Sequence, residues 1–106
     1  LNSVREGADL VREVDRPSFR LLVDAYHLFR DGDSLKSVKE NGDLLRHTHI
    51  ATEANRRPPG LEPFDFTPFF QALKAGGYDG RVSIEAGWQD LSEEAHVALD
   101  ELREYL

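Results

Sequence analysis

The stretch FRLLVD at residues 19–24 decides the fold class of this chain. It is short, mostly apolar and ends in a carboxylate, which is the form of a buried strand in a parallel sheet. Two later stretches share this form, LLRHTHIA at residues 44–51 and RVSIEA at residues 81–86. The sequence therefore predicts three strands, near residues 19–24, 44–51 and 81–86.

Helical segments separate these predicted strands, and each has a start or stop signal. The signals are a cap at Asn2 or Ser3 for a helix to about Val14, Ser34 before a helix that ends at Asn41-Gly42, Thr67-Pro68 before a helix that ends at Gly76-Gly77, and Ser92 before the last helix. Strands that alternate with helices form a parallel sheet through right-handed crossovers. Two α/β architectures stay open: a small open sandwich, or three of the eight units of a (β/α)8 TIM barrel, which takes about 250 residues.

Length, charge and cysteine content restrict the possible classes of protein. The 106 residues suffice for one domain, and 13 Lys and Arg against 20 Asp and Glu give a net charge of -7. This charge argues against nucleic acids and membranes as partners. The absence of cysteine excludes disulfides and thiolate metal sites. The sequence has neither a signal-like start nor a run of roughly 18 to 20 apolar residues, so we expect a cytoplasmic protein.

Each predicted strand ends with a potential metal ligand, Asp24, His49 and Glu85 in turn. The carboxyl ends of parallel strands meet at one edge, where functional groups converge in α/β folds. Oxygen and imidazole donors suit Mn, Mg, Co or Zn better than a soft metal. A single Asp there is more often a cap, and a His more often a core residue, but an unpaired carboxylate in a strand is costly. Their shared position favours one common site.

Three further side chains fall near this predicted edge. His27 comes three residues after Asp24, in the loop or first helical turn beyond the strand, where it can face a substrate. Arg56 and Arg57 lie in the polar loop after the second strand, beside two prolines. A guanidinium on a stiffened loop can fork onto hydroxyl or carboxylate oxygens. The alternatives are a surface histidine and solvated loop charges.

A series of motifs then stands in one order along the chain: LLVDAYH at 21–27, HTHI at 47–50, EANRRPPG at 53–60, GYDG at 77–80 and SIE at 83–85. Together they closely resemble the C-terminal half of the xylose isomerase-like TIM barrel family. Within that family the chain is most similar to the ketose 3-epimerases of the tagatose and psicose epimerase type and to the hydroxypyruvate isomerases. The resemblance implies that residues 1–106 are a single domain fragment, the C-terminal three β/α units of a barrel.

By this resemblance Asp24, His49 and Glu85 are three of the family's four metal ligands, and His27 and Arg56 fall on substrate-binding positions. The spacing from His49 to Arg56 is one residue longer than in the epimerases, which leaves Arg57 as an alternative. The family's fourth ligand is a glutamate at the end of the preceding strand. We expect that strand to lie before this chain, which would then be inactive alone.

The activity that the resemblance implies for the intact protein is that of a divalent-metal-dependent sugar isomerase or epimerase. A ketose or small hydroxy-carbonyl substrate would exchange a proton through an enediolate, with Glu85 as one of two proton-transferring glutamates and Mn, Co, Mg or Zn as cofactor. The expected partners are a sugar substrate and either a second copy or the missing part of the barrel, with no nucleic acid or membrane. The alternatives are an endonuclease IV-like metal hydrolase and a non-catalytic sugar-binding relative.

Overall fold

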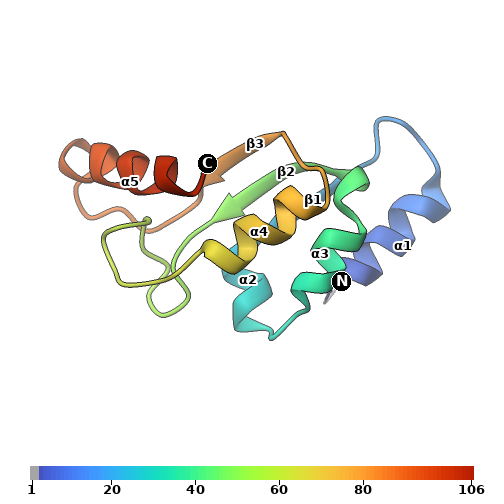
Figure 1. The fold of residues 1–106 in the computed structure, drawn as a ribbon, viewed down its shortest axis with the longest axis horizontal. Helices are drawn as coiled ribbons and strands as arrows, with labels where there is room; N and C mark the ends of the chain where they lie inside the picture. The colour runs from blue at the N-terminus through green and yellow to red at the C-terminus, as the bar shows by residue number, and fades with distance from the viewer. Residues whose placement is uncertain (1–2) are drawn as a thin grey trace.

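The computed structural model describes residues 3–106. Its elements are, in chain order, α1 (Val4–Val14), β1 (Leu21–Asp24), α2 (Ala25–Arg30), α3 (Leu35–Glu40), the 3-10 turn η1 (Gly42–Leu44), β2 (Leu45–Ile50), α4 (Thr67–Ala75), β3 (Arg81–Ile84) and α5 (Leu91–Tyr105) (Figure 1). Within these residues no helix is both long and apolar enough to cross a lipid bilayer.

The three strands form one parallel sheet in the order β1-β2-β3, as predicted. In the register, Asp24 pairs with His49, and His49 pairs with Ser83. The strands are shorter than expected, because regular pairing ends at Ile50 and Ile84. One further hydrogen bond, from the Glu85 N–H to the Ile50 carbonyl at 3.1 Å, continues the ladder beyond β3.

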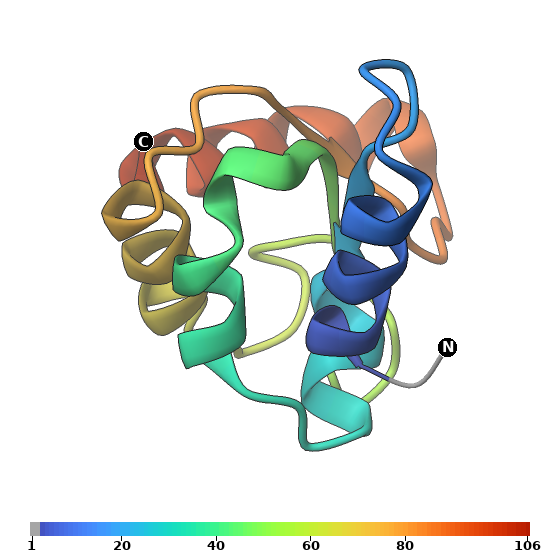
Figure 2. The same ribbon diagram turned by 90° about the vertical axis from the view of Figure 1, so that its right-hand side faces the viewer.

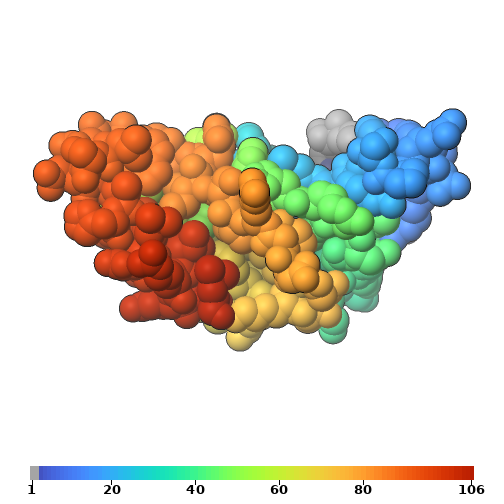
Figure 3. Space-filling view, turned by 90° about the horizontal axis from the view of Figure 1, so that it is seen from above, coloured from blue at the N-terminus to red at the C-terminus, as the bar shows by residue number. Residues whose placement is uncertain are grey.

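Helices cover one face of this sheet. Helices α1, α3 and α4 lie in a row, with α3 between the other two (Figures 1 and 2). The buried apolar cluster between these helices and the sheet includes Val23, Val38, Ile50 and Phe69. On the opposite side, strand residues lie at the surface (Figure 3), and Leu22 is 47% exposed. The sheet is therefore an α/β layer with one face covered and one face open.

Helix α5 lies beyond the carboxyl ends of the strands (Figure 1). It is anchored by Leu102, which is buried in the core cluster, and by Tyr105, whose ring stacks on Phe70 with centroids 5.2 Å apart. The Tyr105 hydroxyl also accepts a hydrogen bond from the Phe66 N–H at 3.3 Å. These contacts fix the C-terminal end of α5 against α4 and the residue before it.

The helix starts agree with the prediction at α1 and differ from it at α2, α4 and α5. Ser3 caps α1 by accepting from the Glu6 N–H at 3.1 Å, whereas Asn2 lies outside the described residues. Residues 25–30 form helix α2, which the strand pattern alone did not indicate. The prediction of Ser92 as the cap of α5 is wrong, because Asp90 occupies the cap and accepts from the Glu93 N–H.

Thr67 is likewise the first residue of α4 rather than its cap, which is Phe66. Pro68 lies in the first turn as expected, since proline needs no N–H partner there. The other predicted signals agree with the structure: Ser34 precedes α3, and Asn41 and Gly42 end it.

The backbones of the α3–η1 segment and the end of α4 touch at two glycines. A Cβ added at Gly42 would lie 2.2 Å from the Gly76 carbonyl oxygen and 2.8 Å from the Gly76 Cα. These are backbone atoms and cannot rotate away. Gly42→Ala is therefore expected to lower the free energy of unfolding by about 1–3 kcal/mol, the range for overpacking.

Urea denaturation followed by circular dichroism measures this change. Gly87→Ala is the matched control, because a Cβ there meets only the Arg56 carbonyl oxygen at 3.6 Å. Equal stability of the two variants would contradict the close packing of α3 against α4.

Candidate functional site

The paired strand ends bring Asp24 and His49 together. Asp24 Oδ2 lies 3.6 Å from His49 Nδ1, and the two side chains are 14% and 25% exposed. The imidazole of His47 packs edge-on against that of His49, with centroids 5.0 Å apart. Because neighbouring residues in a parallel register present their side chains to the same face, this proximity follows directly from the pairing of β1 with β2.

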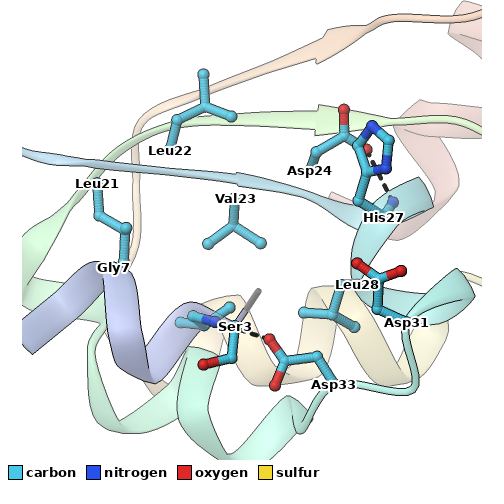
Figure 4. Close-up of a pocket in the computed structure, with 11 residues that line it drawn as sticks. Ser3, Gly7, Leu21, Leu22, Val23, Asp24, His27, Leu28, Asp31 and Asp33 are labelled. Atoms are coloured by element: carbon cyan, nitrogen blue, oxygen red, sulfur yellow. Dashed lines mark hydrogen bonds between the residues drawn. The ribbon is translucent and has the colours of Figure 1, made fainter. Parts of the chain in front are cut away.

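Asp24 has a second role as the N-cap of α2. Its Oδ1 accepts from the His27 N–H at 3.2 Å (Figure 4). Asp24 is thus a helix cap, which was the alternative to a metal ligand in the sequence analysis. Its other carboxylate oxygen still faces His49. His27 stands in the first turn of α2, is exposed, and lies edge-on to the Tyr26 ring with centroids 5.2 Å apart.

Asp24 and His27 also line a cavity of about 330 Å³ along the free edge of β1, between α1 and α2 (Figure 4). Its wall is mixed, with the apolar side chains of Leu21, Val23 and Leu28 beside the polar groups. The cavity lies at the edge of β1 that has no partner strand within the described residues.

Arg56 lies beside α2, although it belongs to the loop between β2 and α4. Its guanidinium carbon lies 4.7 Å from the centroid of the Tyr26 ring, a cation–π distance. Its backbone is left-handed, with φ of 53°. Two hydrogen bonds hold this conformation, from the Arg56 N–H to the Thr52 carbonyl at 3.1 Å and from the Gly87 N–H to the Arg56 carbonyl at 2.8 Å.

Arg57 is held differently. Its guanidinium donates to the Gly87 carbonyl at 2.7 Å and to the Glu94 carboxylate, and the Arg57 and Glu94 side chains are 14% and 9% exposed. Within residues 3–106 the Arg56 guanidinium has no ion pair. Of the two arginines, Arg56 is therefore the one whose donors are free to bind an added ligand.

Glu85 follows the last residue of β3, and its side chain is exposed. Because side chains alternate along a strand, Glu85 shares the face of the sheet with Ser83, whose register partner is His49. No three His, Asp or Glu side chains in residues 3–106 lie close enough together to hold a metal ion. Two carboxylates repel one another in the absence of a cation, so Asp24 and Glu85 gain nothing by approaching.

The donor chemistry fits a hard or borderline divalent cation. Metal–ligand bonds of about 2.1 Å set neighbouring ligands about 3 Å apart, close to the observed separation of Asp24 Oδ2 and His49 Nδ1. A carboxylate oxygen and an imidazole nitrogen are ligands shared by Mn, Co, Mg and Zn sites. The Asp24 carboxylate and the His49 imidazole thus lie near enough to one another for both to bind one cation.

Sequence reasoning missed two groups near the site. The ring of Tyr26 makes a cation–π contact with the Arg56 guanidinium, and Glu94 forms an ion pair with Arg57. A third contact, in which Thr52 and Asn55 donate to Glu62, lowers the pKa of that carboxyl and ties the loop to itself. The sequence signal for Glu94 was its place in the first turn of α5, which indicates a dipole role but no partner.

The sequence of this chain is similar to those of known epimerases and isomerases. A family model described as "Xylose isomerase-like TIM barrel" matches residues 1–106. A ketose 3-epimerase from Arthrobacter globiformis is 33% identical over 87 residues, covering 81% of this chain and 30% of that protein. A putative hydroxypyruvate isomerase from Mus musculus is 32% identical over 87 residues, covering 80% of this chain and 31% of that protein.

Solved structures extend the likeness to the whole chain. The crystal structure of D-allulose 3-epimerase from Methylomonas sp. in complex with D-allulose superposes with a TM-score of 0.88 at 28% identity, covering 100% of this chain and 43% of that one. The chain thus spans about 30% of the length of the two curated relatives and less than half of the solved one.

Proposed function

Because the chain belongs to the xylose isomerase-like TIM barrel family, we propose that it supplies part of the active site of a divalent-metal-dependent sugar isomerase or epimerase. Its three-stranded sheet is an incomplete barrel. The observation that carries the proposal is the Asp24–His49 pair at the carboxyl edge of the sheet, where enzymes of this architecture place their chemistry. We also propose that residues 1–106 are one domain, the C-terminal part of that barrel.

In this proposal Asp24, His49 and Glu85 hold the cation, and a fourth ligand comes from outside this chain. The bound cation, Mn, Co, Mg or Zn, supplies Lewis-acid stabilisation of negative charge on substrate oxygens. The carboxylate of Glu85 takes the proton from the carbon next to the ketose carbonyl, leaving an enediolate. A second carboxylate, also from outside the chain, returns a proton to complete isomerisation or epimerisation.

His27 and Arg56 bind the substrate in this scheme. The exposed imidazole of His27 and the guanidinium of Arg56 both contact the ring of Tyr26, as described above. Both can donate hydrogen bonds to hydroxyl oxygens, and the guanidinium adds positive charge as the enediolate forms. The sugar-processing relatives support a small-molecule sugar as substrate.

Asp24→Asn is expected to weaken Mn²⁺ binding of the intact protein by about a hundredfold or more. The variant keeps the size of the side chain but removes the charged ligand, and loss of groups that merely support ligands already costs about 10–100-fold in metal affinity. Isothermal titration calorimetry measures the affinity. Asp31→Asn is the matched control, since Asp31 lines the same cavity and ends α2.

The same titration tests the proposal as a whole. Wild-type protein that takes up neither Mn²⁺ nor Co²⁺ would exclude this chemistry. Protein that binds metal is then assayed with free ketoses and with a DNA duplex that contains an abasic site. Epimerisation of a ketose supports the proposal, whereas cleavage of the duplex would assign a metal hydrolase, and sugar binding without turnover a non-catalytic relative.

A further inference from the structure

A largely buried ion pair joins the two segments that carry Arg56 and Glu85. Arg57 follows Arg56 in the loop after β2, and its guanidinium bridges the Gly87 carbonyl and the Glu94 carboxylate. Gly87 stands two residues after Glu85, and Glu94 lies in the first turn of α5. One side chain therefore crosses from the loop to the β3–α5 segment.

Backbone contacts make this crossing rigid. Thr52 and Arg57 exchange hydrogen bonds, from the Thr52 N–H to the Arg57 carbonyl and from the Arg57 N–H to Thr52 Oγ1, both at 2.9 Å. Between them Arg56 is locked in its left-handed conformation, which a residue other than glycine adopts only where its surroundings impose it. The hydrogen bond from the Gly87 N–H to the Arg56 carbonyl closes the link from the other side.

Both carboxylate oxygens of Glu94 accept hydrogen bonds. Its Oε1 accepts from the Gln89 and Asp90 N–H groups at 2.9 and 3.2 Å, while Oε2 faces Arg57. The hydrogen bond from Arg57, together with those from the backbone, holds the pKa of Glu94 below its ordinary value. The carboxylate stays charged at neutral pH, so the bridge is intact under working conditions.

We propose that Arg57 and Glu94 are positioning residues, which clamp the substrate-binding Arg56 and the proton-transferring Glu85 at a fixed separation. The inference rests on the proposed function. A buried ion pair often adds little net stability, because desolvation of both charges offsets their attraction. Positioning gives this pair a role that stability alone does not.

Glu94→Gln tests the clamp in the intact protein. The amide oxygen of glutamine can still accept from the backbone, but its NH2 group faces the Arg57 donors, so the bridge opens. We expect kcat/KM for the ketose to fall about tenfold or more, with a higher KM because Arg56 is displaced and a lower kcat because Glu85 is displaced. Arg57→Lys should also lower kcat/KM, because an ammonium group cannot reach the Gly87 carbonyl and the Glu94 carboxylate in the forked geometry of a guanidinium.

Asp100→Asn is the matched control. It breaks the exposed Arg103–Asp100 pair on the same helix, whose side chains are 72% and 70% exposed, and should leave kcat and KM within about twofold. Unchanged kcat and KM in Glu94→Gln, in parallel with a lower melting temperature, would mean that the pair is merely structural and would overturn the inference.

Limited trypsin digestion gives a second readout that does not depend on turnover. Trypsin can cut between Arg56 and Arg57, whereas the Arg57–Pro58 bond resists it. Cleavage follows the population of the open loop, so we expect Glu94→Gln to be cut at Arg56 at least about tenfold faster than wild type and Asp100→Asn. Equal rates would overturn the clamp. Wild-type protein that is inactive on ketoses yet protected at Arg56 would instead refute the proposed function alone.

Discussion

Replacing Glu85 by glutamine in the intact protein is expected to lower kcat by about 10²–10⁴-fold, the range that general acid–base groups contribute. The amide keeps the shape of the side chain but cannot take a proton from carbon. Because Glu85 is also proposed to bind the cation, the assay needs saturating Mn²⁺. Turnover of the ketose and exchange of its carbon-bound hydrogen with deuterated solvent are measured together.

The exchange experiment separates chemistry from binding. Loss of both turnover and exchange in Glu85→Gln, with Mn²⁺ bound, is the expected result. Glu93→Gln is the control, because Glu93 is an exposed carboxylate in the first turn of α5. Full activity of Glu85→Gln would show that another group moves the proton.

Phe69→Ala is expected to lower the free energy of unfolding by about 3–5 kcal/mol. Phe69 is fully buried between the helices and the sheet, and its ring packs edge-on against Phe29 and Phe70 with centroids 6.3 and 5.8 Å away. Truncation removes this apolar contact and leaves a cavity. For a domain whose total stability is about 5–15 kcal/mol, such a loss is a large fraction.

Urea denaturation at neutral pH measures the effect, and Phe19→Ala is its control. Phe19 is the same residue type but is 39% exposed, so its truncation should cost far less. Similar losses from both variants would contradict the placement of Phe69 at the centre of the core.

Patterns confined to a few residues predicted much of the fold. The three parallel strands and their helical crossovers are confirmed, as is the family resemblance that the motifs indicated. Helix α2 was missed because it has six residues and its cap, Asp24, also reads as a strand end. The start of α5 was misplaced because Asp90 and Ser92 are both good caps, and only the folded chain selects between them.

The candidate site was predictable to the extent that it depends on strand register. The closeness of Asp24 to His49 follows from parallel pairing alone. The contact of Arg57 with Glu94 spans 37 residues and depends on the path of a loop, which no local pattern encodes. The left-handed backbone of Arg56 was equally hidden, since arginine has no preference for it.

The two carboxylate oxygens of Asp24 have different partners, which has a consequence for genetic variation at this position. Asparagine caps helices about as well as aspartate, so it would preserve the start of α2 while discarding the negative charge. Alanine would remove both, and the released His27 would shift as well. The effects of Asp24→Ala and of a substitution at His27 should therefore be non-additive, whereas those of Asp24→Asn and the same His27 substitution should be nearly additive. This comparison separates the structural role of Asp24 from its chemical role.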